Sequence, residues 1–175
     1  METSRLLKVR LVPFELPLLK IAHDREALAA HMKLRVPESW PSEGVRKHQI
    51  PDQIRALEAD PASLEWHGRL IVHGGFGPES LAGVANLKGP PDKAGRVEVG
   101  YEVLPDFRTR GIGTEVLRML LHWCDQRPAV KAVIARTEPG NAISQKMLEK
   151  AGFVSVGWQQ HPVIGEVILW ERTRT

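Results

Sequence analysis

Cysteine is nearly absent from this 175-residue chain, which has only Cys124. A single cysteine excludes an intrachain disulfide framework and a zinc site built from cysteines. Long apolar runs are also missing, because no stretch approaches the roughly 20 residues that a membrane-spanning helix needs. The first residues, Met1 to Arg5, lack the apolar core of a secretory signal peptide. These absences favour a cytoplasmic protein with no membrane partner.

Neither sign of charge is in large excess. Lys and Arg number 24 against 21 Asp and Glu, which gives a net charge of +3. No run of like charges occurs, and the basic residues are not interleaved with aromatics, so we expect no nucleic-acid partner. The small excess leaves two interpretations open, a mixed basic surface or a local basic site for an anionic ligand. The seven histidines form no His-x-x-x-His or comparable carboxylate cluster, so we expect no metal site.

What remains is an ordinary globular composition, with 42% hydrophobic and 26% charged residues and no repeat or linker. At this length we expect one domain over residues 1–175. Apolar periodicity predicts strands over 7–14, 64–72, 80–87, 96–104, 130–135, 153–158 and 163–172. It predicts helices over 18–32, 51–59, 112–125 and 142–151. This order favours an α/β fold, a mixed sheet with helices on both faces.

The clearest helix is predicted over 112–125. Ile112, Val116, Leu120 and Cys124 form one apolar stripe, and Pro128 ends the pattern. The stripe predicts that Cys124 faces the core and has a structural role.

The segment Arg108-Thr109-Arg110-Gly111-Ile112-Gly113-Thr114 follows a predicted strand and opens this helix. Gly111 and Gly113 leave the backbone bare, so a ligand can approach closely. The N–H groups of the first helical turn favour an anion, and Arg108 and Arg110 add positive charge. Together they predict a phosphate cradle, while the glycines alone fit an ordinary strand-to-helix turn equally well. The segment has neither the Gly-Lys-Ser/Thr of a P-loop nor the third glycine of a dinucleotide fingerprint.

Three blocks of the sequence resemble the GNAT superfamily of N-acetyltransferases. Arg108-x-x-Gly111-x-Gly113 matches its (Arg/Gln)-x-x-Gly-x-(Gly/Ala) signature, and residues 99–107 resemble the fourth strand and loop before that signature. Asn141-x-x-Ser144 and the following Leu-Glu-Lys-Ala-Gly-Phe of residues 148–153 resemble a later helix of the family. The close resemblance covers about residues 96–157. The later helix is most similar to the ribosomal-protein N-terminal acetyltransferase branch.

This resemblance implies a GNAT-like fold, with a mixed, mostly antiparallel, twisted sheet of about seven strands that is splayed between strands 4 and 5. It also implies an acyltransferase that moves an acetyl group from acetyl-CoA directly to a primary amine. The pyrophosphate would lie on the signature loop, and the pantetheine would pair with the end of the fourth strand. Asn141 matches a position that often contacts the coenzyme, although a helix cap alone is an equal alternative. The implied coenzyme-binding residues are Val103, Leu104, Arg108, Thr109, Arg110, Gly111, Ile112, Gly113, Thr114 and Asn141.

Acetyl transfer needs a base and a donor for the developing oxyanion, and an acid for the thiolate is optional. Glu98 and Glu102 share one face of the strand over 96–104, unless a family-type bulge changes their facing. Glu98 acting through water is the expected base and Glu102 the alternative, although each could be only a surface or paired carboxylate. The resemblance implies Val103 N–H as the oxyanion donor. His161 and Glu166 are weaker candidates for the base.

The tyrosine acid of many family members is replaced by Leu148 in this sequence. Ser144, one turn earlier, is the nearest hydroxyl that could substitute, or it merely supports the first helical turn. Acceptor recognition would fall to residues 35–44 and 158–163, which carry Trp40 and Trp158. Each tryptophan is either a substrate wall or simply packed.

The sequence leaves the acceptor open between a small-molecule amine and a protein or peptide N-terminus. The oligomeric state stays open between monomer and homodimer. Two further hypotheses compete with the enzyme, a non-catalytic coenzyme A-binding sensor or regulatory module of the same fold, and an unrelated phosphate-binding domain.

Overall fold

The computed structural model describes residues 2–4, 8–75 and 77–174. The chain forms two compact units that interleave along the sequence. The first comprises Met1–Asn86 and Tyr101–Val116, and the second Leu87–Gly100 and Leu117–Thr175. The residues of strand β5 (Arg96–Val103) and of helix α4 (Ile112–Asp125) are each divided between the two units.

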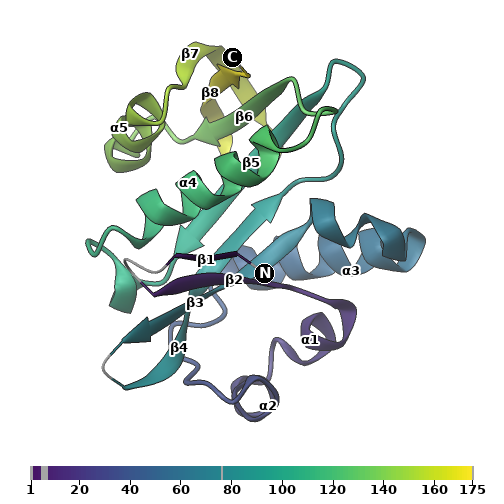
Figure 1. The fold of residues 1–175 in the computed structure, drawn as a ribbon, viewed down its shortest axis with the longest axis vertical. Coiled ribbons are helices and arrows are strands. Elements are labelled where there is room, and N and C mark those ends of the chain that lie inside the picture. The colour runs from purple at the N-terminus through teal and green to yellow at the C-terminus, as the bar shows by residue number, and fades with distance from the viewer. Residues whose placement is uncertain (1, 5–7, 76, 175) are drawn as a thin grey trace. The chain divides into compact units, whose positions relative to one another are not determined.

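Four antiparallel strands build the first unit. These are β1 (Glu2–Ser4), β2 (Val9–Pro13), β3 (Gly68–Gly75) and β4 (Gly77–Leu87), hydrogen-bonded in that order (Figure 1). The end of β5 lies beside β4, since Leu104 N–H donates to Ala82 O at 2.8 Å. Of the strand predicted over 7–14, residue 7 lies outside the described residues. Strand β1 is an addition to the predicted set.

The helices of the first unit differ from the prediction at two places. The single helix predicted over 18–32 is wrong, because the chain forms α1 (Leu16–Ile21) and α2 (Arg25–Met32) instead. Asp24 separates them by capping α2, where its carboxylate accepts from Ala27 N–H at 3.0 Å. A π-helical turn (Val45–Gln49) leads into α3 (Ile50–Ala59), and a 3₁₀ helix (Pro61–Trp66) replaces the predicted start of the strand over 64–72.

The second unit contains the start of β5, then β6 (Ala132–Thr137), α5 (Ala142–Lys150), β7 (Val154–His161) and β8 (Gly165–Thr173). Its strand order is β5-β6-β8-β7, with β5 and β6 parallel and the other pairs antiparallel. The parallel register runs from Arg96–Ala132 to Glu98–Ile134, and both strands continue beyond it. This divergence is the predicted splay, and the mixed, mostly antiparallel sheet is confirmed.

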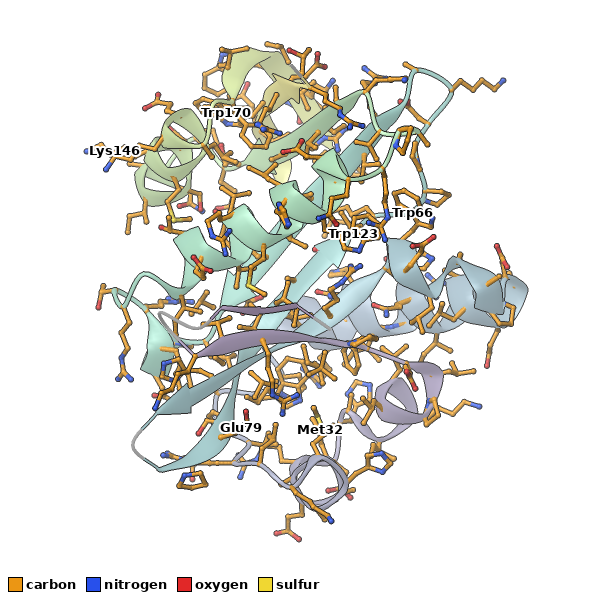
Figure 2. All side chains as sticks on the ribbon, viewed as in Figure 1. Met32, Trp66, Glu79, Trp123, Lys146 and Trp170 are labelled. Atoms are coloured by element: carbon orange, nitrogen blue, oxygen red, sulfur yellow. The ribbon has the colours of Figure 1, made fainter. Side chains whose placement is uncertain are left out.

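Helix α4 begins and ends at the predicted residues. All four members of its predicted stripe are buried, and the Cys124 thiol is completely so. In the second unit Trp170, which is labelled in Figure 2, is buried as well, and its Nε1–H donates to Thr137 Oγ1 at 2.9 Å. Along the described residues, no helix combines the length and apolar character that crossing a membrane would require.

Candidate active site

The loop from β5 to α4 belongs to the first unit and contains the predicted phosphate cradle. After Leu104 the chain makes a short 3₁₀ turn (Pro105–Phe107), and residues 108–111 are exposed. Gly111 has φ +76°, in the left-handed region that glycine adopts without strain. Helix α4 begins at the next residue, and the N–H groups of a first helical turn have no intrahelical acceptor. The backbone here can therefore accommodate an anion at the positive end of the helix.

Both arginine side chains of this loop are engaged. Arg108 Nε–H donates to Val103 O at 3.0 Å, which ties the loop back to the end of β5. The Arg110 guanidinium lies over the Phe107 ring, 5.7 Å from its centroid. Their positive charge stays beside the loop, while the bare backbone at Gly111 remains exposed.

Of the two residues predicted to pair with the pantetheine, Val103 and Leu104, only Val103 has backbone groups directed away from β4. Leu104 N–H is used within the sheet by Ala82 O. Neighbouring residues of a strand direct their backbone groups to opposite sides, so Val103 faces away from β4. A ligand that pairs with the strand would therefore contact Val103. A hydrogen bond from the ligand to Val103 O would replace the one from Arg108.

Burial alternates along the first part of β5, where Val97 and Val99 are buried, and the alternation ends at Gly100. Tyr101, Glu102 and Val103 are all partly buried. The simple two-face pattern predicted for residues 97–103 therefore holds for the first half of the strand.

Glu102, the alternative base, lies in the first unit against the segment predicted to recognise the acceptor. Ser42 Oγ donates to Glu102 Oε2 at 2.9 Å and also accepts from Val45 N–H at 3.3 Å. Among the residues that the structure describes, no cation pairs with this carboxylate.

Glu98, the expected base, lies in the second unit between two cations. Lys88 Nζ donates to its Oε1 at 2.5 Å, and Arg136 Nη1 donates to Oε2. The side chain is only 14% exposed. Proton abstraction by Glu98 would therefore compete with two ion pairs.

Asn141 and Ser144 lie at the start of α5, also in the second unit. Asn141 Oδ1 accepts from Ser144 N–H at 3.1 Å, so Asn141 is the N-cap of this helix as predicted. Asn141 is exposed and Ser144 partly buried, while Leu148, at the position of the family tyrosine, is buried. A helix cap and a surface-accessible amide thus coexist at one residue.

The outlying base candidates lie in the β7–β8 hairpin. His161 Nδ1 accepts from the N–H groups of Val163 and Ile164 at 3.2 and 3.4 Å, which assigns the ring proton to Nε2. Burial lowers the pKa of His161, and Lys88 and Arg136 lower it further against the opposing effect of Glu98. His161 therefore presents an N–H donor. Glu166 is exposed on β8.

The two tryptophans differ in burial. Trp40 is 2% exposed, its Nε1–H donates to Ala22 O at 3.0 Å, and its ring packs on Phe14. Trp40 is thus part of the core of the first unit. Of the two predicted roles, substrate wall or packed residue, it has the second. Trp158 on β7 is 60% exposed and is the tryptophan able to contact a ligand.

Sequence reasoning missed the partners of both carboxylates. Ser42 is 60 residues from Glu102, and Arg136 is 38 residues from Glu98, so no local pattern marks either pair. It also missed a cavity of about 290 Å³ in the first unit, to which Arg110 contributes. Within residues 2–4, 8–75 and 77–174, no group of three or more His, Cys, Asp and Glu side chains could hold a metal ion.

Comparisons with known proteins agree with the resemblance seen in the sequence. A family model described as an acetyltransferase (GNAT) domain matches residues 11–154. The N-acetyltransferase YjdG of Bacillus subtilis (strain 168), itself uncharacterized, is 29% identical over 156 residues. The match covers 88% of this chain and 89% of YjdG.

Two solved structures share the fold. A GNAT-family acetyltransferase from Bordetella pertussis superposes with a TM-score of 0.70 at 17% identity, covering 99% of this chain and 98% of the other. RimL, a ribosomal L7/L12 alpha-N-protein acetyltransferase solved in complex with coenzyme A, superposes with a TM-score of 0.66 at 13% identity, covering 99% and 97%.

Proposed function

This chain belongs to the GNAT family of acetyltransferases, and on that premise we propose that it transfers the acetyl group of acetyl-CoA to a primary amine, directly and in a ternary complex. We treat its two units as one catalytic domain, because the family match at residues 11–154 includes segments of both. We place its activity in the cytosol, where a single buried thiol such as Cys124 stays reduced.

The observation that carries this proposal is the left-handed Gly111 directly before the N-terminus of α4, inside the family signature. A pyrophosphate fits here because the backbone is bare and the helix end is positive. The backbone of residues 108–114 would hold the phosphates, Val103 would pair with the pantetheine, and the Asn141 amide would add a contact. Bound acetyl-CoA supplies the thioester carbonyl that the amine attacks.

The contacts of the two carboxylates support Glu102 as the proposed base, ahead of Glu98. Glu102 accepts a hydrogen bond from the neutral Ser42 hydroxyl, whereas both oxygens of Glu98 are engaged by cations. Glu102 also touches residues 35–44, the segment from which acceptor recognition is expected. In this role Glu102 takes the proton of the incoming ammonium, directly or through water.

No essential side-chain acid is proposed. The buried Leu148 supplies no proton, and the thiolate of coenzyme A is a tolerable leaving group without one. The Ser144 hydroxyl is the remaining candidate in α5. For the acceptor we propose a small amine or a peptide N-terminus, which the exposed Trp158 could contact.

The proposal is tested by calorimetric titration of acetyl-CoA into the protein and its variants Gly111→Asp and Gly113→Asp. A carboxylate in the cradle fills the space for the pyrophosphate and repels it, so we expect affinity to fall by about 100-fold or more. Gly44→Asp is the control, because it adds the same bulk and charge at an exposed glycine outside the loop, where nothing lies within 4 Å of the Cβ position. Unchanged affinity in both aspartate variants would refute the cradle.

A second assay separates the enzyme from a non-catalytic module. Release of free coenzyme A thiol is measured with a panel of small amines and short peptides. Turnover with any of them supports acetyl transfer. Tight coenzyme binding with no turnover across the panel would favour a sensor or regulatory module of the same fold.

A further inference from the structure

We propose that the first unit carries a second anion site, a pocket that binds the phosphate monoester of a small organic molecule beside the coenzyme loop. The pocket has a volume of about 290 Å³, at the lower end of the range for small-molecule sites. Its polar lining consists of Arg35, His73, Ser80, Asp106 and Arg110, and its apolar wall of Pro78 and Phe107.

The charge of the lining is positive. Two guanidiniums, Arg35 and Arg110, face one carboxylate, Asp106, and no ion pair joins them across the described residues. The carboxylate of Glu79, labelled in Figure 2, is unavailable to Arg35. Arg10 holds it in a bidentate pair at 2.9 and 2.5 Å. Among the described residues Arg35 has no ionic partner, so it presents an uncompensated charge to the cavity.

Each of the two arginines is held by a contact within the first unit. The backbone of Arg35 is bound to β4 on both sides, since Arg35 N–H donates to Glu79 O and Leu81 N–H donates to Arg35 O, each at 2.8 Å. Arg110 stacks on Phe107, whose ring lies 5.9 Å from the His73 imidazole. The backbone of Arg35 and the guanidinium of Arg110 are therefore held in place before an anion binds, which lowers part of the ordering cost.

The neutral donors favour a phosphate monoester over a carboxylate. Burial lowers the pKa of His73, and the nearby Arg110 and Lys8 lower it further, which favours the neutral imidazole before an anion binds. It can donate one N–H, as the Ser80 hydroxyl can donate its O–H. Two guanidinium forks and two neutral donors exceed what two carboxylate oxygens accept but suit three phosphate oxygens. The ring of Phe107 and Pro78 give the organic part an apolar surface.

The pocket is distinct from the coenzyme cradle. Of residues 108–114 only Arg110 lines it, through a side chain directed onto Phe107, and neither Gly111 nor Gly113 contributes. A ligand there would leave the bare backbone before α4 accessible.

Phenyl phosphate is the probe for this site, titrated calorimetrically into the full chain at pH 7.5. We expect one binding site, much weaker binding of benzoate, and none of phenol, which lacks the charge. Saturating coenzyme A is expected to leave the phenyl phosphate affinity within about twofold. Loss of phenyl phosphate binding in the presence of coenzyme A would overturn a separate site.

Three substitutions test the lining. Arg35→Gln removes one charge-assisted donor and is expected to weaken phenyl phosphate about tenfold, whereas Asp106→Asn removes repulsion and is expected to tighten it severalfold. Arg25→Gln, an exposed arginine on α2 outside the pocket, is the matched control and should change nothing. Thermal unfolding checks that each variant is folded.

Two results would refute the inference: no binding of phenyl phosphate, or binding that Arg35→Gln and Asp106→Asn leave unchanged. The outcome is independent of the proposed function. Coenzyme binding without phenyl phosphate binding removes only the pocket, and the reverse removes only the acetyl-transfer proposal.

Discussion

Gly83 fixes the distance between β4 and the second half of β5. Its φ is +151°, and a Cβ at this position would lie 2.0 Å from the Glu102 carbonyl oxygen. The close approach follows a bulge in the β3–β4 register, where Ile71 pairs with Gly83 and Val72 with Leu81. The backbone of the proposed base Glu102 can thus lie this close to β4 only because residue 83 is a glycine.

Replacing Gly83 with alanine should therefore be costly. The clash with backbone and the unfavourable φ together are expected to reduce the free energy of unfolding by about 2–4 kcal/mol. Urea denaturation measures this loss. Gly44→Ala is the control, since nothing lies within 4 Å of its Cβ position. Equal stability of the two variants would contradict the contact.

The choice of base is decided by one carboxyl-to-amide exchange. Glu102→Gln should lower kcat about 100- to 10,000-fold at pH 7, the usual effect of losing a general base. Activity should recover partly at high pH, where the amine acceptor is already deprotonated. The measurement is a pH–rate profile with any acceptor found in the amine panel.

Glu98→Gln is the comparison for this experiment. It removes a carboxylate that pairs with Lys88 and Arg136, so we expect a loss of stability with a wild-type-shaped pH profile. If Glu98→Gln instead loses the rate and Glu102→Gln retains it, the base is Glu98. Ser144→Ala should cost much less than either.

Among the helices, α4 was predictable and the α1–α2 pair was not. The apolar stripe of α4 runs unbroken, and its end is marked in the sequence by Pro128. In the segment 18–32 the apolar pattern continues through Ala22 and Leu28, and both are buried. Periodicity alone therefore joins the two helices, because the apolar pattern does not show the break that the cap at Asp24 marks.

The candidate site likewise has a part that the sequence predicts and a part that it does not. The signature loop was predictable because a strand, two glycines and a helix start are consecutive in the sequence. Ser42 beside Glu102, and Lys88 and Arg136 beside Glu98, were not, because these pairs form through tertiary packing. The direction of Arg110 onto Phe107 was missed for a different reason, since it depends on a side-chain rotamer.

Helix α5 offers a test that separates a cap from a ligand contact. Asn141→Ala should reduce the free energy of unfolding by about 1 kcal/mol, because Ser144 N–H loses its acceptor. Asn141→Ser keeps a capping oxygen and should restore that stability. Stability comes from urea denaturation, and acetyl-CoA affinity from calorimetry of the serine variant. A stable Asn141→Ala variant would mean that the side chain does not cap α5.

In both units, histidines and carboxylates with lowered pKa values make the free energy of unfolding depend on pH in the same direction. Burial is the main cause that lowers the pKa of His67, His73 and His161. The Arg10 side chain lowers the pKa of the Glu79 carboxyl, and the Arg96 N–H lowers that of Asp92. In every case the unfolded chain binds protons at a higher pH than the folded chain, so stability falls as pH falls.

The two classes of group act in different pH windows. For the histidines the loss begins below the usual pKa of 6.5 and is complete below their lowered folded values. For the carboxylates it begins only below their usual values of 4.5 and 3.8. Between pH 7.5 and 5.5 the histidines therefore dominate.

We expect the free energy of unfolding to fall between pH 7.5 and 5.5, and to fall again below pH 4.5. His67→Gln combined with His73→Gln should reduce the first step to the part that His161 contributes, because glutamine fills similar volume without titrating, while the second step stays. Urea denaturation at pH 7.5, 5.5 and 3.5 measures both steps. His23→Gln, at an exposed position, serves as the control and should keep the wild-type curve. A double variant whose first step is as large as that of the wild type would show that the buried imidazoles do not carry this proton linkage.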